Sequence, residues 1–269
     1  MGLFDVHAHL TDRRLAAREE EVLSNAARAG VTTIVTNGLN PGDNRAVLAL
    51  AARAPAVKAA IGLYPVDAVL PEMLAMGVPY ERPDAAPTSG DEGAAFVEEH
   101  GHEAVAIGEI GLDRHWVPEA LWARQEEVFR RLVRAARHLG KPVVVHSRKA
   151  EQRMLEVLVE EGADRVDWHC FGGKVKLGQR IAEHRGQWLS IPANAAKSES
   201  FRRLLETLPR DRVLLETDCP YLGPERGVLN EPANVAVTLA LAAELWGCPE
   251  ERVLDQLEDN FEALFGFRP

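Results

Sequence analysis

The feature of this sequence that most limits its fold is a regular alternation of short apolar runs with longer stretches of helical spacing. We expect strands at residues 3–7, 31–37, 57–63, 104–109, 142–147, 165–170, 187–191 and 212–218. We expect helices between and after them, at roughly 12–29, 43–54, 91–102, 120–139, 149–162, 174–185, 198–208 and 233–247. In residues 126–140, for example, apolar side chains recur every three or four positions and a glycine follows, which is typical of an amphipathic helix and its end.

Eight strand–helix repeats in 269 residues predict an α/β fold, a (β/α)8 TIM barrel. A doubly wound open sheet is the alternative, because periodicity alone does not show that a sheet closes. No low-complexity linker divides the chain, so we expect one domain over residues 1–269. Residues 76–93 are rich in proline and glycine, which predicts one long surface loop after the third strand.

Charge and composition narrow the possible function classes. The formal net charge is -10 and no block of basic residues is present, which disfavours extended binding to duplex DNA. No apolar run approaches the roughly 18 residues of a membrane span, and the N-terminus lacks the pattern of a secretory signal. Three scattered cysteines do not make a disulfide framework. We therefore expect a cytoplasmic protein without membrane association.

The first expected strand carries polar side chains at every second position. In the stretch LFDVHAHL, Asp5, His7 and His9 alternate with apolar residues. Side chains two apart on a strand point to the same side, so the two imidazoles can reach a common point. Neutral imidazole is the commonest protein metal ligand. An edge strand with a polar outer face would give the same pattern. The rest of the sequence is needed to distinguish that strand from a metal site.

More histidines and carboxylates stand at the ends of other expected strands. Six candidate ligands end strands one, four, five, six and eight: His7, His9, Glu109, His146, His169 and Asp218. In a closed barrel the C-terminal ends of the strands form one mouth, where the active sites of such barrels lie. Scattered core or surface residues would have no reason to follow this rule, so we predict one shared site.

These residue types suit a binuclear metal centre. Four imidazoles and two carboxylates can hold two divalent ions, with one carboxylate bridging them. Four positive charges against two negative ones favour an anionic substrate such as a phosphate ester. A metal-bound water ionises near neutral pH and supplies a hydroxide nucleophile. Asp218 can both bind a metal and take the proton of that water, which makes it the candidate catalytic residue.

Six ordered motifs extend the pattern over nearly the whole chain. They are DVHAHL, GEIGLD, KPVVVHSR, HCFGG, LLETDCPYL and RGVLNEP. In this order and spacing they resemble the TatD-like metal-dependent hydrolases of the amidohydrolase superfamily, many of which carry the name deoxyribonuclease. The resemblance runs from about residue 3 to the segment DNFEALFG near the end.

The resemblance implies a TIM barrel of the metal-dependent hydrolase type with two divalent ions. It implies that the six strand-end residues are the ligands, with Glu109 as the bridge. It also implies an enzyme that hydrolyses ester bonds, a deoxyribonuclease acting on DNA ends or short single strands, with a small nucleic-acid or phosphodiester substrate as its partner. The metal stays open: four histidines favour zinc, manganese or iron, whereas the family is often assayed with magnesium.

One position departs from the family pattern. Family members usually read Gly-x-His-Pro after the third strand, and here GLYP places Tyr64 where the histidine stands. Tyr64 is therefore a candidate substrate contact, because its hydroxyl can donate a hydrogen bond and its ring can stack on a base. Aromatic packing over the barrel rim is the alternative.

Other residues are candidates for supporting roles. Arg148, two residues beyond the histidine of the fifth strand, is a candidate phosphate clamp, and Asn230 in RGVLNEP is a further candidate substrate contact. Asp113 and Glu216 can orient ligand histidines, and Asp5 shares the inward face of the first strand. The alternatives are a solvated Arg148, a satisfied Glu216 in the barrel layer, and a helix-entry turn around Asn230.

Two other classes of function stay open. An amidohydrolase would use the same two-metal site on an amide, lactone or other small-molecule C–N or C–O bond. Against this, Glu109 stands where many of those enzymes use a modified lysine. A non-catalytic metal-binding protein is the third class, and the intact set of ligands with a candidate base disfavours it. Metal analysis followed by a screen of phosphodiesters and amides separates the three.

Overall fold

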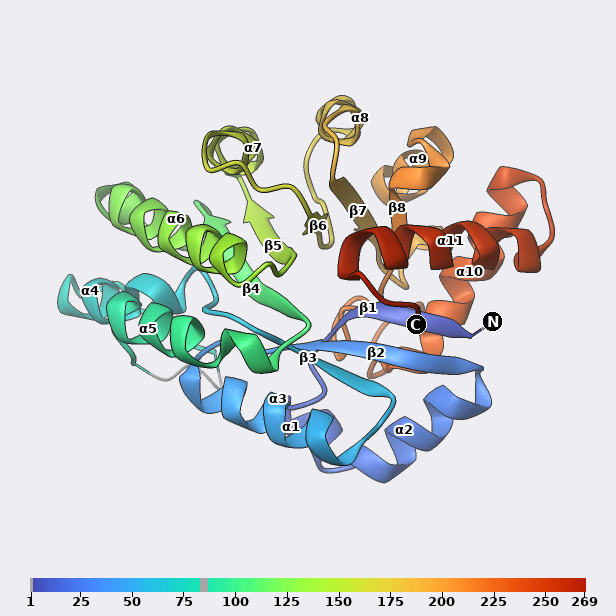
Figure 1. Ribbon diagram of the computed structural model, residues 1–269, viewed down its shortest axis with the longest axis horizontal. Helices are drawn as coiled ribbons and strands as arrows, with labels where there is room; N and C mark the ends of the chain where they lie inside the picture. The colour runs from blue at the N-terminus through green and yellow to red at the C-terminus, as the bar shows by residue number, and fades with distance from the viewer. Residues whose placement is uncertain (1, 83–86) are drawn as a thin grey trace.

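A computed structural model describes residues 2–82 and 87–269, and at its centre eight parallel strands stand side by side in a ring (Figure 1). The strands are β1 (Leu3–Ala8), β2 (Val31–Asn37), β3 (Val57–Ile61), β4 (Ala106–Asp113), β5 (Val143–Arg148), β6 (Val166–Trp168), β7 (Gln187–Ile191) and β8 (Val213–Leu215). Each strand pairs with the next one along the chain, from β1 to β8. This order confirms the predicted (β/α)8 barrel and excludes the doubly wound sheet, in which the strand order reverses at a switch point.

The ring closes through the segment that follows β8. The backbone N–H of Asp218 donates to the carbonyl of His7 at 2.9 Å, and the N–H of His9 donates to the carbonyl of Cys219 at 2.8 Å. β8 is shorter than the predicted strand 212–218 because the chain turns at Asp218, whose φ of 53° lies in the left-handed region that aspartate tolerates. The end of β1 and this turn are therefore held beside each other.

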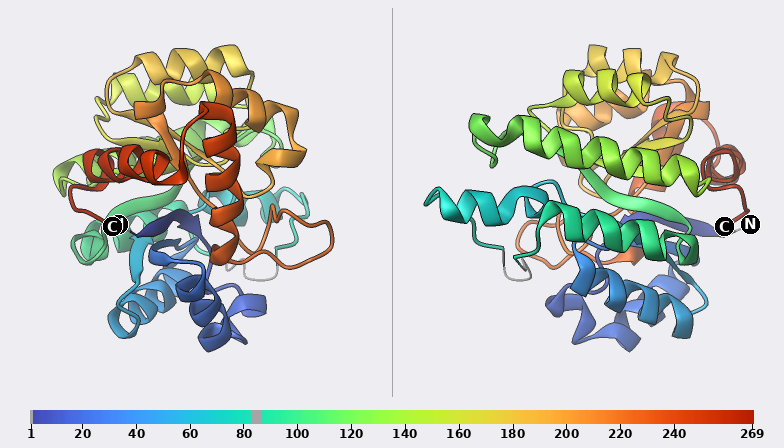
Figure 2. Two further views of the ribbon diagram at one scale, coloured as in Figure 1. Left: turned by 90° about the vertical axis from the view of Figure 1, so that its right-hand side faces the viewer. Right: turned by 60° about the vertical axis from the view of Figure 1, so that its left-hand side comes forward.

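Helices form an outer layer around the strands (Figure 2). They are α1 (Arg13–Ala16), α2 (Glu19–Arg28), α3 (Pro41–Arg53), α4 (Leu70–Ala75), α5 (Gly90–His100), α6 (Trp122–His138), α7 (Glu151–Glu160), α8 (Val175–Glu183), α9 (Glu199–Thr207), α10 (Val235–Trp246) and α11 (Glu250–Phe265). Short 3-10 turns lie at Asp67–Val69, Gly101–Glu103, Glu119–Leu121, Ala195–Lys197, Arg210–Arg212 and Pro232–Asn234. Among the described residues, no helix has both the length and the apolar composition needed to span a membrane.

Helix α6 shows how the sequence builds this outer layer. Its apolar residues at spacings of one, three and four are buried against the barrel: Val128, Phe129, Leu132 and Val133. Each such side chain contributes roughly 1.5–3 kcal/mol when it is fully buried. The opposite face is charged, and Arg131 pairs there with Glu98 of α5 at 2.7 Å. The amphipathic pattern therefore fixes which face of the helix meets the strands.

Two predicted segments contain other elements than expected. The predicted helix 12–29 is two helices, α1 and α2, and the side chain of Asp12 caps the first of them. The predicted loop 76–93 ends in α5, which begins at Gly90 behind a capping box made by Ser89 and Glu92. Residues 83–86 of that loop lie outside the described residues. In addition, the predicted strand 104–109 is longer in the structure, because β4 runs on to Asp113, so Glu109 lies within the strand and not at its end.

Two helices were not predicted. Helix α4 is a short insertion after β3. Helix α11 carries an apolar face of Val253, Leu257, Phe261 and Leu264, and the ring of Phe261 packs 4.8 Å from that of Phe4 on β1. Its three- and four-residue spacing was sufficient to predict it. It adds a helix beyond the eight repeats and packs next to the first strand.

Candidate metal centre

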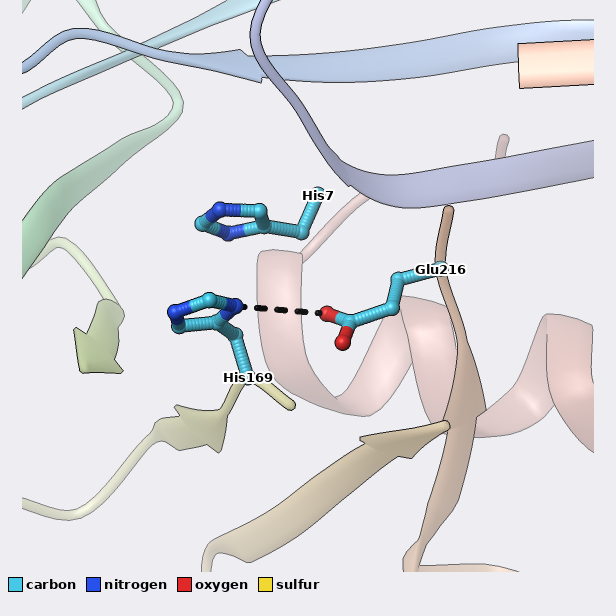
Figure 3. A group of neighbouring side chains, drawn as sticks. All are labelled: His7, His169 and Glu216. Atoms are coloured by element: carbon cyan, nitrogen blue, oxygen red, sulfur yellow. Dashed lines mark ion pairs between the residues drawn. The ribbon is translucent and has the colours of Figure 1, made fainter. Parts of the chain in front are cut away.

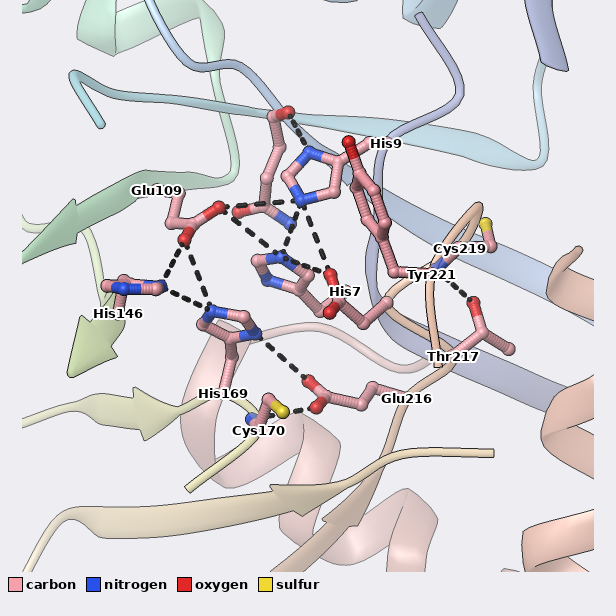
Figure 4. A network of polar contacts seen from close by, with 12 residues as sticks. His7, His9, Glu109, His146, His169, Cys170, Glu216, Thr217, Cys219 and Tyr221 are labelled. Atoms are coloured by element: carbon pink, nitrogen blue, oxygen red, sulfur yellow. Dashed lines mark hydrogen bonds and ion pairs between the residues drawn. The ribbon is translucent and has the colours of Figure 1, made fainter. Parts of the chain in front are cut away.

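The structure brings the six predicted ligand residues together at the carboxyl-terminal mouth of the barrel. His7 lies on β1, Glu109 on β4 and His146 on β5. His9 and His169 directly follow β1 and β6, and Asp218 lies in the turn after β8. Figure 4 shows dashed contacts from the single carboxylate of Glu109 to both pairs of histidines. Glu109 is therefore the geometric centre of the group.

A first set of donor atoms surrounds one point beside Oε2 of Glu109. The Nε2 atoms of His7 and His9 lie 3.2 Å apart. They lie 3.6 and 3.4 Å from Oε2 of Glu109. They lie 3.7 and 3.5 Å from Oδ1 of Asp218. Both nitrogens thus lie within 3.7 Å of an oxygen of each carboxylate.

A second set surrounds the other oxygen of the same carboxylate. Nδ1 of His146 lies 3.0 Å and Nε2 of His169 lies 3.2 Å from Oε1 of Glu109. These two nitrogens lie 3.4 Å from each other. Each oxygen of Glu109 therefore faces its own pair of histidines.

Both sets fit a small divalent cation. Metal–ligand bonds of about 2.0–2.1 Å in a tetrahedral site place neighbouring donor atoms roughly 3.3 Å apart. The donor atoms of each set approach one another at distances on either side of that value, and the residues are imidazoles and carboxylates, which zinc and manganese accept. The residues present can therefore hold metal ions on both sides of Glu109.

The buried carboxylates of the candidate metal centre also favour a positive charge on neighbouring groups. Burial lowers the pKa of His146, but its hydrogen bonds with Asp113 and Glu109 outweigh burial and raise the pKa to about 9. Burial likewise lowers the pKa of His9, and the carboxylates of Asp218 and Glu109 raise it to about 9. The carboxylates thus favour the protonated forms of His9 and His146, and metal cations would supply positive charge in place of those protons. Burial instead lowers the pKa of His7 well below its ordinary value, which keeps that imidazole in the neutral form that binds metals.

The outer edge of His146 is held by a buried carboxylate. Oδ2 of Asp113 lies 3.2 Å from Nε2 of His146. The other oxygen, Oδ1, accepts hydrogen bonds from the backbone N–H groups of His115 and Trp116 at 2.8 and 2.9 Å. Asp113 is therefore fixed in place beside the ring, in a position from which it can orient His146.

Glu216 stands behind His169 (Figure 3). Its Oε2 lies 3.8 Å from Nδ1 of His169, on the side of the ring away from Glu109. Its two oxygens accept hydrogen bonds from the backbone N–H of Cys170 and the hydroxyl of Ser190, both at 2.7 Å. The contact with His169 is thus an ion pair of longer range, and Glu216 also ties β7 to the turns after β6 and β8.

Asp5 supports the site through the backbone and not through an imidazole. Its Oδ1 accepts hydrogen bonds from the N–H of Thr217 at 2.9 Å and from the N–H of His7 at 3.2 Å. Burial raises the pKa of Asp5 to about 7. The side chain therefore joins β1 to the segment that carries Asp218.

A cavity of about 700 Å³ opens over the two sets of donor atoms. Two of the predicted substrate contacts, Tyr64 and Arg148, line it. The ring of Tyr64 meets that of His146 edge-on at 5.1 Å, and Cζ of Arg148 lies 5.7 Å from the ring centroid of Trp116. The cavity thus combines candidate metal ligands with aromatic and cationic groups in one lining.

Asn230 does not lie in this cavity. It is 1% exposed, and its amide donates hydrogen bonds to the carbonyls of Thr217 and Tyr221 at 2.8 and 2.6 Å. Its side-chain oxygen accepts from the amide of Asn234 at 2.8 Å. The predicted substrate contact is therefore not supported, because both ends of the side chain hold the loop after β8.

Sequence reasoning missed several residues of the cavity wall. Trp116, Tyr80 and Arg82 come from loops whose apolar spacing carries no signal. Tyr221 could have been found, because it stands three residues after Asp218 in the same motif. Tyr221 is 44% exposed, and its ring meets that of His9 edge-on with 6.5 Å between the ring centroids.

Known proteins are similar to this chain in sequence and in fold over nearly its whole length. Residues 4–266 match the family model described as TatD related DNase. The chain is 32% identical over 273 residues to YabD, an uncharacterized metal-dependent hydrolase of Bacillus subtilis, with 98% of each chain covered. It is 30% identical over 269 residues to human deoxyribonuclease TATDN3, covering 98% of this chain and 95% of that protein. The crystal structure of YjjV, a TatD homolog of Escherichia coli, matches with a TM-score of 0.83 and 26% identity over 98% of both chains.

Proposed function

This chain belongs to the TatD-related DNase family of metal-dependent hydrolases, and on that premise we propose that it hydrolyses phosphodiester bonds at DNA ends or in short single strands. One of its relatives, human TATDN3, carries the name deoxyribonuclease. A net charge of -10 argues against a long duplex as the substrate, because such binding relies on many cationic contacts.

The observation that carries the proposal is the position of Glu109. Its two oxygens face separate histidine pairs at the floor of a cavity whose walls hold Tyr64, Trp116 and Arg148. Two-metal sites of this type serve phosphoryl-group hydrolysis in phosphatases and nucleases. Aromatic rings and a guanidinium are the groups that bind bases and phosphates of single strands.

We assign the six predicted ligand residues to two cations. His7, His9 and Asp218 would hold one cation, and His146 and His169 would hold the other. Glu109 lies between the two groups and would contribute one carboxylate oxygen to each. When bound, these cations supply Lewis-acid activation of a water nucleophile and neutralise charge on the phosphate oxygens. Zinc, manganese and magnesium are the candidates.

Two side chains have direct roles in the proposed reaction: Asp218 acts on the attacking water and Arg148 binds the phosphate. Asp218 presents Oδ1 to His7 and His9, is 9% exposed and borders the cavity, so Oδ2 can accept the proton of the attacking water. Arg148 is exposed on the cavity wall and can bind a phosphate oxygen with its planar guanidinium. Hydrolysis adds one water across the P–O bond, so no other co-reactant is needed.

The experiment that tests this function is a substrate screen with defined metals. The protein is stripped of metal, reloaded in turn with zinc, manganese and magnesium, and assayed on dinucleotides, short single-stranded oligonucleotides, amides and lactones. Metal-dependent cleavage of the phosphodiesters supports the proposal. Turnover of an amide or lactone with no phosphodiester cleavage under any metal would replace it with the amidohydrolase alternative.

We also propose a cytoplasmic location. The three cysteines, Cys170, Cys219 and Cys248, are all free thiols, as expected in a reducing compartment.

A further inference from the structure

Four cationic residues stand on neighbouring loops at one side of the barrel mouth. Arg148 ends β5 and Lys149 follows it, Lys174 stands between β6 and α8, and Lys197 stands between β7 and α9. All four are exposed to solvent. Strands β5, β6 and β7 are neighbours in the ring, and their carboxyl-terminal ends meet at the mouth, so we call these residues the cationic arc.

The positive charge of the cationic arc is only partly balanced. The segments 149–150, 169–174 and 192–198, which follow β5, β6 and β7, contain no aspartate or glutamate. Two acidic residues directly follow these segments, Glu151 and Glu199, in the first turns of α7 and α9. Among the described residues, none of the four cations forms an ion pair. The arc thus sets four positive charges against two negative ones, in a protein whose net charge is -10.

The other side of the mouth carries paired or negative charge. Arg14, after β1, pairs with Asp12 at 2.7 Å, and Arg82, after β3, pairs with Asp67. The segment 216–234 after β8 contains four acidic residues and one arginine. Charge therefore favours an anionic chain over the loops of β5 to β7 and disfavours it over those of β8 and β1.

The cationic arc begins at the cavity over the candidate metal centre. Arg148 lines this cavity, and so does Gly172, two residues before Lys174. Cζ of Arg148 lies 5.7 Å from the ring centroid of Trp116, and Trp116 is 46% exposed. Glu81 also lines the cavity but forms no ion pair with Arg148 in the described chain. An exposed indole beside a guanidinium suits a stacked base and the phosphate next to it.

The backbone at Lys149 is held in an unusual conformation. Its φ of 56° lies in the left-handed region, which residues other than glycine, asparagine and aspartate seldom adopt. Its N–H donates to Oε1 of Glu151 at 2.9 Å, and the next residue, Ala150, is 3% exposed. Non-glycine residues that are kept in this region occur often at functional sites. The exposed lysine therefore stands at a turn that is fixed by β5 before it and by buried Ala150 after it.

We propose that the cationic arc binds the phosphates of a single-stranded nucleic acid, so that the strand leaves the candidate metal centre over the loops of β5, β6 and β7. The proposal rests on the proposed phosphodiester hydrolysis. The base beside the metal centre stacks on Trp116, and Arg148 binds the phosphate next to it. Lys149, Lys174 and Lys197 meet the phosphates further along the strand. A dinucleotide reaches only the first of these groups, whereas a longer strand reaches all of them.

The test compares a dinucleotide with a single-stranded oligonucleotide of about eight nucleotides, a length within the range that single-strand sites cover. The metal-loaded protein is assayed on both at several salt concentrations, and rates are counted for the first cleavage. At low salt the longer strand should have a kcat/KM about threefold higher or more, since each exposed charge pair contributes modestly. This advantage should fall as salt rises, with a logarithmic slope of about -0.7 for each phosphate that a cation neutralises.

Two outcomes separate this strand path from the proposed function. Equal kcat/KM for both lengths, or the same salt dependence for both, would overturn the path while cleavage of the dinucleotide leaves phosphodiester hydrolysis standing. Cleavage of neither substrate under any metal would refute the proposed function itself, and the cationic arc as a substrate path would fall with it.

Variants that remove one charge then test the residues of the arc. Lys174→Gln and Lys197→Gln should each lower the ratio of kcat/KM between the longer strand and the dinucleotide about twofold. Each should also flatten the salt slope of the longer strand by about 0.7. Lys149→Asn should act in the same way, because asparagine still tolerates the left-handed backbone. Lys141→Gln removes a lysine before β5, at the opposite end of the barrel, and should leave the ratio and the slope unchanged. An unchanged ratio in all three arc variants, or an equal fall in Lys141→Gln, would overturn the role of the cationic arc.

Discussion

Oδ2 of Asp113 lies 3.2 Å from Nε2 of His146, at the edge of the ring opposite to the Nδ1 atom that faces Glu109 at 3.0 Å. The carboxylate therefore determines which nitrogen of His146 is presented to the candidate metal centre. Burial raises the pKa of Asp113, but its hydrogen bond with His146 outweighs burial and holds the pKa below its ordinary value. The pair is thus an oriented imidazole with an ionised partner.

We predict that Asp113→Asn weakens metal binding without unfolding the barrel. A neutral amide still accepts from the backbone of His115 and Trp116 but holds the imidazole less strongly. The loss expected for such a partner is roughly 10–100-fold in metal affinity. Titration of the metal-free protein with zinc measures it, and Asp164→Asn is the matched control. Equal affinities in both variants would show that Asp113 has no orienting role.

We predict that Glu109→Gln lowers the metal content from about two ions per chain to one or fewer. An amide presents one oxygen and one N–H group, so it does not bridge two cations as a carboxylate does. Elemental analysis of the purified variant measures the content. Retention of both ions at the level of the unmodified protein would remove Glu109 from the bridging role.

We predict that Asp218→Asn lowers turnover by at least the roughly 100-fold typical of a lost general base. The backbone N–H of residue 218 would still donate to the carbonyl of His7, so the closure of the ring should persist. Turnover and metal content are measured on the same sample, because the variant removes a ligand oxygen as well as a base. Unchanged phosphodiester cleavage would contradict the role of Asp218.

We predict that Tyr64→Phe raises the KM for a dinucleotide or DNA end a few-fold and leaves the metal content unchanged. The hydroxyl is lost, whereas the ring that packs on His146 and under Arg82 remains. Tyr64→His restores the family pattern and should raise phosphodiesterase activity. If neither variant changes cleavage, Tyr64 serves only to pack the rim.

Much of the barrel could be predicted from the sequence because burial imposes a strict pattern on strands and helices. The predicted strands 31–37 and 187–191 have the same bounds as β2 and β7. Strands β6 and β8 are shorter than the predicted strands 165–170 and 212–218. The backbone enters the left-handed region at Cys170 and at Asp218, which ends the extended conformation there. Such a turn depends on one residue's conformation and leaves no mark on apolar periodicity.

In the candidate site too, residues on the strands could be predicted from the sequence and residues on the loops could not. His7, His9 and Glu109 follow from the rule that active sites lie at the C-terminal ends of barrel strands, and the structure places them together. Asn230 fails as a substrate contact because its partners are backbone carbonyls brought near by loop folding. Trp116 reaches the rim for the same reason, since loop conformation has no period that a sequence reveals.

The most direct test of the account is the position of the bound metal. Crystals of the manganese- or zinc-loaded protein are measured at the absorption edge of that metal, and anomalous difference maps locate the ions. We predict two peaks about 3.5–4 Å apart, one on each side of the Glu109 carboxylate. A single peak beside His7 and His9 would show that His146 and His169 do not bind a metal ion. Peaks that do not contact Glu109 would contradict the binuclear centre altogether.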